Sequence, residues 1–159
     1  MGQQQLLLLV LSTVIVGLAT VAGIQAFSEN QAQAAQDALT QRGTSISSDV
    51  QGAYGRPSQM GGFDDFNGTA GTDIADALGY DYSTVSSSEA EVSAEGAGSD
   101  GTCTISATDD GTNGRVLITC SAGDANQDVT VGFDPDEDPQ VQTDYGSSGT
   151  SDPFSSGSP

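Results

Sequence analysis

The feature that most constrains this chain is an uncharged apolar run of 22 residues, residues 6–27. The run reads LLLLVLSTVIVGLATVAGIQAF and, as an α-helix, would measure about 33 Å at about 1.5 Å per residue. That length is sufficient to cross the hydrocarbon core of a bilayer. Its hydroxyl groups are tolerable in a dry environment, because they can bond back to the preceding helical turn. The run must therefore be kept out of water by a membrane or by other protein.

The side chains that we expect to form this dry surface are mostly large and aliphatic. They are Leu6, Leu7, Leu8, Leu9, Val10, Leu11, Val14, Ile15, Val16, Gly17, Leu18, Val21, Gly23, Ile24 and Phe27. Gly17 and Gly23 would let neighbouring helices approach closely. A plain membrane anchor that packs against nothing is the simpler alternative. A cleaved secretory signal is a further alternative. It fits less well, because residues 1–5 are not basic and the apolar run is longer than that of a typical signal.

The helix is predicted to continue beyond the apolar run. Residues 28–42 are rich in Ala and Gln and contain neither Pro nor Gly. A weakly apolar stripe at helical spacing consists of Phe27, Ala34, Ala35, Ala38 and Leu39. Gly43 is a natural place for the helix to end, although Ile46, Val50 and Tyr54 recur every four residues and favour continuation. We therefore predict a helical segment over residues 1–54, with an apolar half and an amphipathic half.

Three β-strands are predicted within residues 102–133. Alternating residues would share one buried face: Cys103, Ile105 and Ala107 on the first strand, Val116, Ile118 and Cys120 on the second, and Val129, Val131 and Phe133 on the third. A small sheet with one apolar face needs a cover, and the amphipathic half of the helix can supply it. The predicted fold class is α+β: a long N-terminal helix packed by a small antiparallel sheet.

The two cysteines fit a cross-strand disulfide. If the first hairpin turns at residues 109–114, Cys103 lies directly opposite Cys120, and opposed side chains are near bonding range. Closing this loop would stabilise the domain by about 3 kcal/mol in the chain-entropy model. Two buried free thiols are the alternative. A disulfide indicates an oxidising compartment outside the cytoplasmic membrane.

The remaining segments give weaker signals. We expect Phe63 and Phe66 to pack on the helix, a short helix capped by Asp73, and an edge strand near Tyr80, Tyr82 and Val85. Residues 55–133 would form an acidic head domain. Residues 134–159, rich in Pro, Ser and Gly, are predicted to be a disordered tail.

The charge excludes several functions. Asp and Glu number 22 against three arginines, and the net charge is −19, so nucleic acid would be repelled. Such an acidic surface suits a halophilic source, since hydrated like charges keep proteins soluble in brine. The chain has no histidine and no recognisable catalytic motif, so we predict neither an enzyme nor a cofactor or zinc site.

Two surface features are candidate binding or modification sites. Acidic clusters at residues 64–65, 109–110 and 134–138 could hold calcium, but none has ligands at regular alternating positions, so we favour solvated acidic surface. Asn67 begins an Asn-Gly-Thr triplet, the minimal pattern for N-glycosylation.

This organisation, an apolar N-terminal run continuing into an amphipathic helix and then a small disulfide-bonded sheet, resembles the type IV pilins and pseudopilins. In that family a peptidase cuts after a Gly, and the mature chain carries a Glu at its fifth position. Gly2 and Gln3 flank the candidate cleavage site here. The fifth residue counted from Gln3 is Leu7, and counted from Met1 it is Gln5, so the acidic signature is absent.

The resemblance implies a subunit of an extracellular helical filament on the cell surface. Its partners would be identical subunits, the inner membrane before assembly, and a pilus assembly machinery. The alternative function is a single-pass, membrane-anchored acidic surface protein that does not polymerise. Positive-inside asymmetry does not fix the orientation, because no Lys or Arg closely flanks the apolar run.

Overall fold

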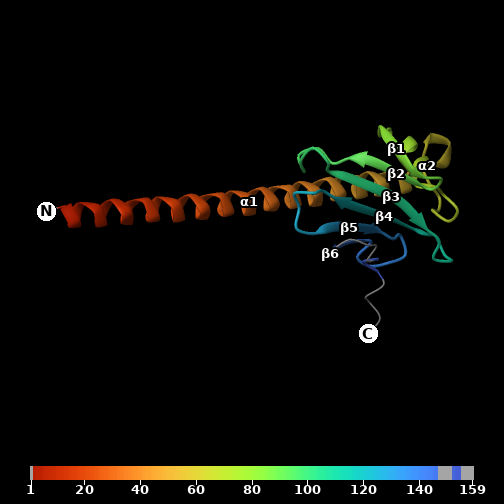
Figure 1. Ribbon diagram of the computed structural model, residues 1–159. Helices are drawn as coiled ribbons and strands as arrows, with labels where there is room; N and C mark the ends of the chain where they lie inside the picture. Colours follow the sequence, from red (N-terminus) through yellow and green to blue (C-terminus); the bar gives the residue numbers. More distant parts are fainter. Residues whose placement is uncertain (1, 147–151, 155–159) are drawn as a thin grey trace.

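The computed structural model describes residues 2–146 and 152–154 and shows one long helix with a small sheet around its C-terminal half (Figure 1). Helix α1 spans Gly2–Tyr54, and a short 3-10 helix, η1, spans Ser58–Met60. Helix α2 spans Gly71–Leu78. The strands are β1 (Tyr82–Ser86), β2 (Glu89–Ser93), β3 (Thr102–Thr108), β4 (Arg115–Ser121), β5 (Asp128–Phe133) and β6 (Val141–Gly146). The α+β prediction is confirmed.

Helix α1 runs through Gly43 without interruption, as the recurrence of Ile46, Val50 and Tyr54 favoured. Gly43 is buried, and a Cβ added there would lie 2.9 Å from Cγ2 of Val131 and 3.4 Å from Sγ of Cys120. The glycine therefore lets the helix backbone come close to the sheet, which outweighs its low helix propensity. The helix ends at Tyr54, shortly before the Arg56-Pro57 pair that cannot continue it.

The buried stripe of α1 differs in part from the predicted one. The buried residues are Ala32, Ala35, Leu39, Gly43, Ile46, Ser47, Val50 and Ala53, which recur every three or four positions. Ala35 and Leu39 were predicted correctly, but Phe27 and Ala34 are exposed. Ala34 was misassigned because alanine is small enough to occur on either face, and Phe27 lies beyond the end of the sheet.

The six strands form one antiparallel sheet in sequence order, from β1 to β6. The predicted hairpin is confirmed, and Cys103 pairs with Cys120 across β3 and β4. The residues predicted for the buried face of β3, β4 and β5 are in the core, with Ala107 only partly buried. Leu117 and Thr130, which alternate with them, are buried as well, so the burial on β4 and β5 is not confined to one face. The expected edge strand is β1, whereas β2 was not predicted.

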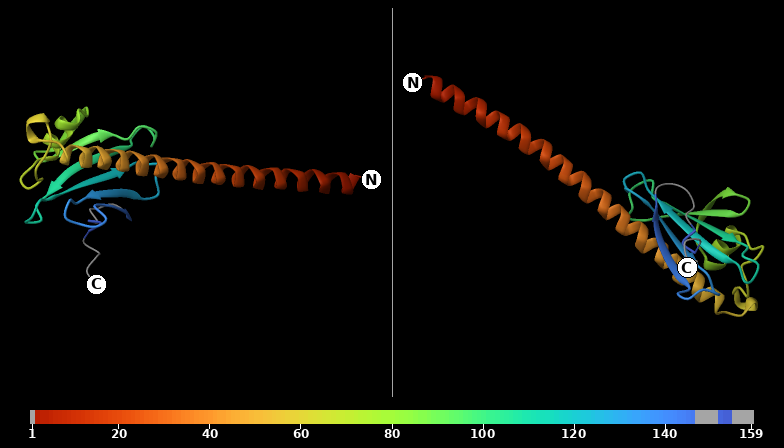
Figure 2. Two further views of the ribbon diagram at one scale, coloured as in Figure 1. Left: turned by 180° about the vertical axis from the view of Figure 1, so that it is seen from behind. Right: turned by 90° about the horizontal axis from the view of Figure 1, so that it is seen from below.

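Both helices cover the same face of the sheet. Helix α1 packs mainly on β4 and β5, and α2 packs on β2 and β3 (Figures 1 and 2). At one end of this core, Phe66 is fully buried and stacks on Tyr54 with ring centroids 5.7 Å apart. Phe63 lies 5.4 Å from Phe66, so both aromatics pack near the helix end as predicted.

Two further predictions were wrong. The segment 134–146, assigned to a disordered tail, forms a turn and strand β6, which pairs with β5 from Asp128↔Gly146 to Phe133↔Val141. Strand β6 lies at the sheet edge, and its residues are half-buried or exposed and mostly polar. Its apolar signal is therefore weak. Asp73 lies in the first turn of α2, but Ala70 is the N-cap. Of the rest of the predicted tail, only residues 152–154 are described.

The described C-terminal residues lie against the outer face of the sheet. A Cβ on Gly132 would overlap the ring of Phe154 and lie 2.8 Å from Cγ of Pro153. Asp152 forms a 2.9 Å ion pair with Arg115 at the start of β4. Residues 152–154 thus cover part of the face that α1 leaves open.

Candidate assembly and membrane surface

The N-terminal half of α1 projects from the head and contacts no other described part of the chain (Figures 1 and 2). Residues 2–31 are all exposed, and Ala32 is the first buried residue. This projection measures about 45 Å at about 1.5 Å per residue. The large apolar side chains from Leu6 to Phe27 are 50% to 68% exposed. A monomer in water would therefore carry a very large apolar surface, which marks an interaction or membrane surface.

The polar groups within this surface need no outside partner. Oγ of Ser12 donates to the carbonyl of Leu9 at 2.8 Å. Thr13 and Thr20 bond back in the same way to Val10 and Val16, each at 2.8 Å. Intrahelical bonding leaves these hydroxyls compatible with a bilayer or a packed helix bundle. The helix therefore meets both the length and the polarity requirements for membrane insertion.

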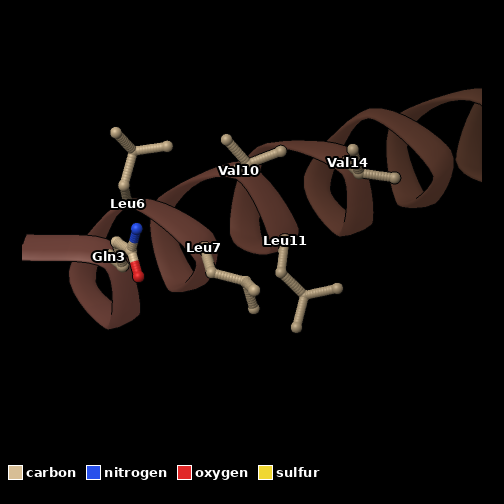
Figure 3. A pocket seen from close by; sticks show the side chains of 6 residues that line it. All are labelled: Gln3, Leu6, Leu7, Val10, Leu11 and Val14. Atoms are coloured by element: carbon tan, nitrogen blue, oxygen red, sulfur yellow. The ribbon is translucent and has the colours of Figure 1, made fainter.

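A shallow apolar groove runs along the first turns of the projection. It is lined by Gln3, Leu6, Leu7, Val10, Leu11 and Val14. Leu6 and Val10 form one row along the helix, and Leu7 and Leu11 form the neighbouring row (Figure 3). Side chains four residues apart form the ridges that interdigitate when two helices pack. The groove between these rows has the form that receives a ridge from a second helix.

Gly17 and Gly23, in the projection, contact none of the residues that the structure describes, so packing within that part of the chain does not require them to be glycine. A Cβ added to Gly17 or Gly23 would meet nothing within 4 Å, whereas one added to Gly43 would meet the sheet. Glycine inside a helix costs about 1 kcal/mol relative to alanine. A close approach by a second helix backbone would offset that cost, as the sheet does at Gly43.

Charge is separated sharply along the molecule. Residues 2–28 carry no charged side chain, and Glu29 is the first. Two of the three arginines are engaged within the head: Arg42 lies 5.0 Å above the ring of Tyr80, and Arg115 pairs with Asp152. The hydroxyl of Tyr80 donates to Asp49, and its pKa is raised to about 12, first by burial and then by that carboxylate. The acidic groups are therefore concentrated in and near the head, and the helical segment 2–28 is uncharged.

The predicted disulfide joins Cys103 to Cys120, and both residues are fully buried. It lies under α1, since Sγ of Cys120 is the neighbour of Gly43 described above. The crosslink thus secures the two central strands against which the docked half of the helix packs. No free cysteine is present in the described residues.

Three carboxylates meet at one end of the sheet, which spacing along the sequence did not reveal. Oxygens of Asp110, Asp134 and Asp136 all lie within 4.8 Å of one another. Asp110 accepts hydrogen bonds from the backbone N–H groups of Thr112 and Gly114, and Asp134 accepts one from Asp136. The β3–β4 and β5–β6 turns bring the group together. Its hydrogen bonds give the carboxylates a role in shaping both turns.

Their environments move the pKa values in opposite directions. Burial raises the pKa of Asp134, which is 4% exposed. The hydrogen bond from the backbone N–H of Asp136 opposes this rise, and the negative charges of Asp110 and Asp136 add to it. The backbone N–H of Thr112 lowers the pKa of Asp110. The acids at residues 64 and 65 are not part of this group, and Asp65 instead accepts a hydrogen bond from the backbone of Asn67.

The candidate modification sites have defined surroundings. Nδ2 of Asn67, the atom that would carry a glycan, donates to the carbonyl of Thr112 at 2.7 Å. Gly2 and Gln3, which flank the candidate processing site, belong to α1. Glycosylation and processing both remain predictions.

Comparisons of the chain with models of protein families, with curated protein sequences and with solved structures gave no match.

Proposed function

We propose that this chain is a structural subunit of an extracellular helical filament, similar in organisation to type IV pilins, and polymerises through the projecting half of α1. The observation that carries the proposal is the all-round exposure of residues 6–27 on a helix whose hydroxyls are already satisfied. Such a surface needs a dry environment on every side. A bundle of identical helices supplies one.

Packing detail favours copies of the same helix over lipid alone. The rows Leu6–Val10 and Leu7–Leu11 leave a groove that a matching ridge can fill. Gly17 and Gly23 stand open where a neighbouring backbone could approach. When such a contact joins different surfaces of two copies, and the rotation between them does not close a ring, it generates a helical polymer.

The membrane would hold the subunit before assembly. The apolar run has the length of a bilayer span, and the same surface stays dry on transfer from lipid to the filament core. The buried disulfide fits an oxidising location for the head. The role is structural, with no catalytic step, and the acidic surface is consistent with a saline environment.

The second candidate is a single-pass, membrane-anchored surface protein that does not polymerise. The same 22-residue run favours it, because length and hydropathy alone are sufficient for anchoring. Under this alternative Gly17 and Gly23 face lipid and serve no packing role.

Fractionation of the producing cells separates the two candidates. Cells are sheared, and the released material and the detergent-solubilised membranes are each assayed for the chain and imaged by negative stain. The filament proposal expects fibres that contain the chain in the sheared fraction. Recovery only from solubilised membranes, as a detergent-bound monomer, would favour the anchor.

A further inference from the structure

We propose that polymerisation is controlled by ionic strength, because assembly brings strongly acidic heads together while the helical segments that drive it, residues 2–28, carry no charged side chain. This inference rests on the proposed filament and identifies its regulation. Its physical basis is the segregation of charge between residues 2–28 and the rest of the chain.

The contact between helices should be insensitive to screening. No charged side chain occurs before Glu29, so added salt removes no attraction within the apolar bundle. Salts that are excluded from protein surfaces strengthen apolar burial. Electrostatic control must therefore act through the heads and through the segment that joins them to the apolar run.

The heads carry few positive charges that could form ion pairs with the acids of a neighbouring head. All but one of the 22 acids follow the projecting segment, against three arginines. Arg42 contacts Tyr80 and Arg115 pairs with Asp152 in the same chain. Within residues 2–146 and 152–154, Arg56 is the exposed arginine for which the structure shows no ion pair. Neighbouring heads would therefore meet mainly as like charges.

Glu29 is the point at which this repulsion is closest to the bundle. It is exposed and lies two residues after Phe27, on the continuous helix that leads to the head. In a bundle of parallel helices, copies of Glu29 would be the first charged side chains after the apolar run. The screening length shortens from about 10 Å at 0.1 M salt to about 3 Å at 1 M. Acidic groups that face one another within about 10 Å on neighbouring subunits therefore repel at the lower salt and are largely screened at the higher.

The test uses the full-length chain, purified in a nonionic detergent and diluted below the micelle concentration at two NaCl concentrations. Fibres are measured by sedimentation and negative stain. We expect the protein concentration needed for assembly to be at least about tenfold lower at about 1 M than at about 0.1 M NaCl. Equal thresholds at the two salt concentrations would overturn the inference.

Charge variants separate repulsion from other effects of salt. Six exposed acids for which the structure shows no hydrogen bond are neutralised: Asp37→Asn, Asp64→Asn, Asp81→Asn, Glu95→Gln, Asp124→Asn and Glu137→Gln. The neutralised chain should assemble at the lower salt, and Glu29→Gln alone should lower the threshold in the same direction. A matched control exchanges Asp for Glu and Glu for Asp at the same six positions and should behave as the original chain. A neutralised chain that keeps the full salt requirement contradicts the inference.

Two readouts keep this result distinct from failure of the filament proposal. If no variant forms fibres at any salt concentration, the filament proposal itself is wrong. Thermal unfolding followed by circular dichroism at both salts reports whether the head is folded. If the head is unfolded at about 0.1 M salt, the salt dependence arises from folding of the head and not from repulsion between heads. That result would also overturn the inference.

Discussion

The two halves of α1 are continuous in backbone and opposite in environment. From Ala32 onward, apolar residues occupy one face and bury it on the sheet, and the other face is polar. Before Ala32, apolar residues occupy all faces and none is buried. Gly43 is needed for close packing within the chain, whereas Gly17 and Gly23 meet nothing. The difference teaches that the docked half is specified by packing on its own sheet, whereas the projecting half packs on none of the described residues.

The largest expected effect comes from a charge in the projecting half. Val14→Asp should abolish both filament assembly and membrane retention, since an aspartate at the centre of a membrane helix costs about 3 kcal/mol. Fractionation and negative stain measure both outcomes. Gln41→Asp, on the exposed face of the docked half, is the matched control and should leave assembly unchanged. If the Val14→Asp variant assembles normally, the projecting half of α1 does not need a dry environment, and the proposed difference between the two halves is wrong.

The same truncation in each half should affect different properties. Leu39 is fully buried, so Leu39→Ala should lower the free energy of unfolding of the head by about 2–5 kcal/mol. Leu11 is 50% exposed, and Leu11→Ala should leave head stability unchanged while weakening assembly. Urea unfolding followed by the signal of the β-sheet measures the first effect. Equal destabilisation by both variants would show that the projection packs on its own head.

Removal of the crosslink should weaken the head alone. The disulfide closes a loop with a sequence separation of 17, so the double change Cys103→Ala, Cys120→Ala should cost about 3 kcal/mol of head stability. Calorimetry should show a lower melting temperature. The variant should still partition into membranes, because residues 6–27 are unchanged. If the variant no longer associates with membranes although its head is still folded, the disulfide does not affect the head alone.

The glycines give a finer test. Gly43→Ala should destabilise the head by about 1 kcal/mol, because crowding against Val131 outweighs the gain in helix propensity. Gly17→Ala should leave head stability unchanged and, if a neighbouring helix approaches there, raise the concentration needed for assembly. Chemical unfolding and sedimentation measure the two effects. If Gly17→Ala assembles as well as the original chain, this glycine is not a contact.

The smallest effect concerns pH, to which residues 2–28 contribute no titratable side chain. Burial raises the pKa of Asp134 in the folded state, so its contribution to stability is present at low pH and is lost as the pH rises through the raised value. The pKa of Asp110 is lowered, so its contribution is present above its unfolded pKa and lost as the pH falls through the lowered value. Near neutral pH, Asp134→Asn should therefore stabilise the head and Asp110→Asn should destabilise it. Urea unfolding at several pH values measures the change in the free energy of unfolding for each variant. If both variants change the stability of the head in the same direction near neutral pH, the prediction is wrong.

Much of the fold could be predicted because its signals are local. Alternation identified the three central strands, and the hairpin position paired Cys103 with Cys120. Strand β6 was missed because an edge strand that is half exposed shows little apolar alternation, and its neighbourhood is rich in Pro and Asp. The buried stripe of α1 was only partly predicted, since alanines such as Ala34 occur on either face of a helix. The Asp110, Asp134 and Asp136 group depends on two turns meeting in space, which no spacing in the sequence expresses.

Photo-crosslinking at Val14 tests the central claim most directly. A photoreactive amino acid replaces Val14 in the full chain, and the producing cells are irradiated before shearing. The extracellular fraction is then analysed by denaturing electrophoresis and intact-mass measurement. The account predicts a ladder of covalent multimers in which one copy's apolar segment is joined to another's. Monomers only, or native chains that begin after Phe27, would contradict it.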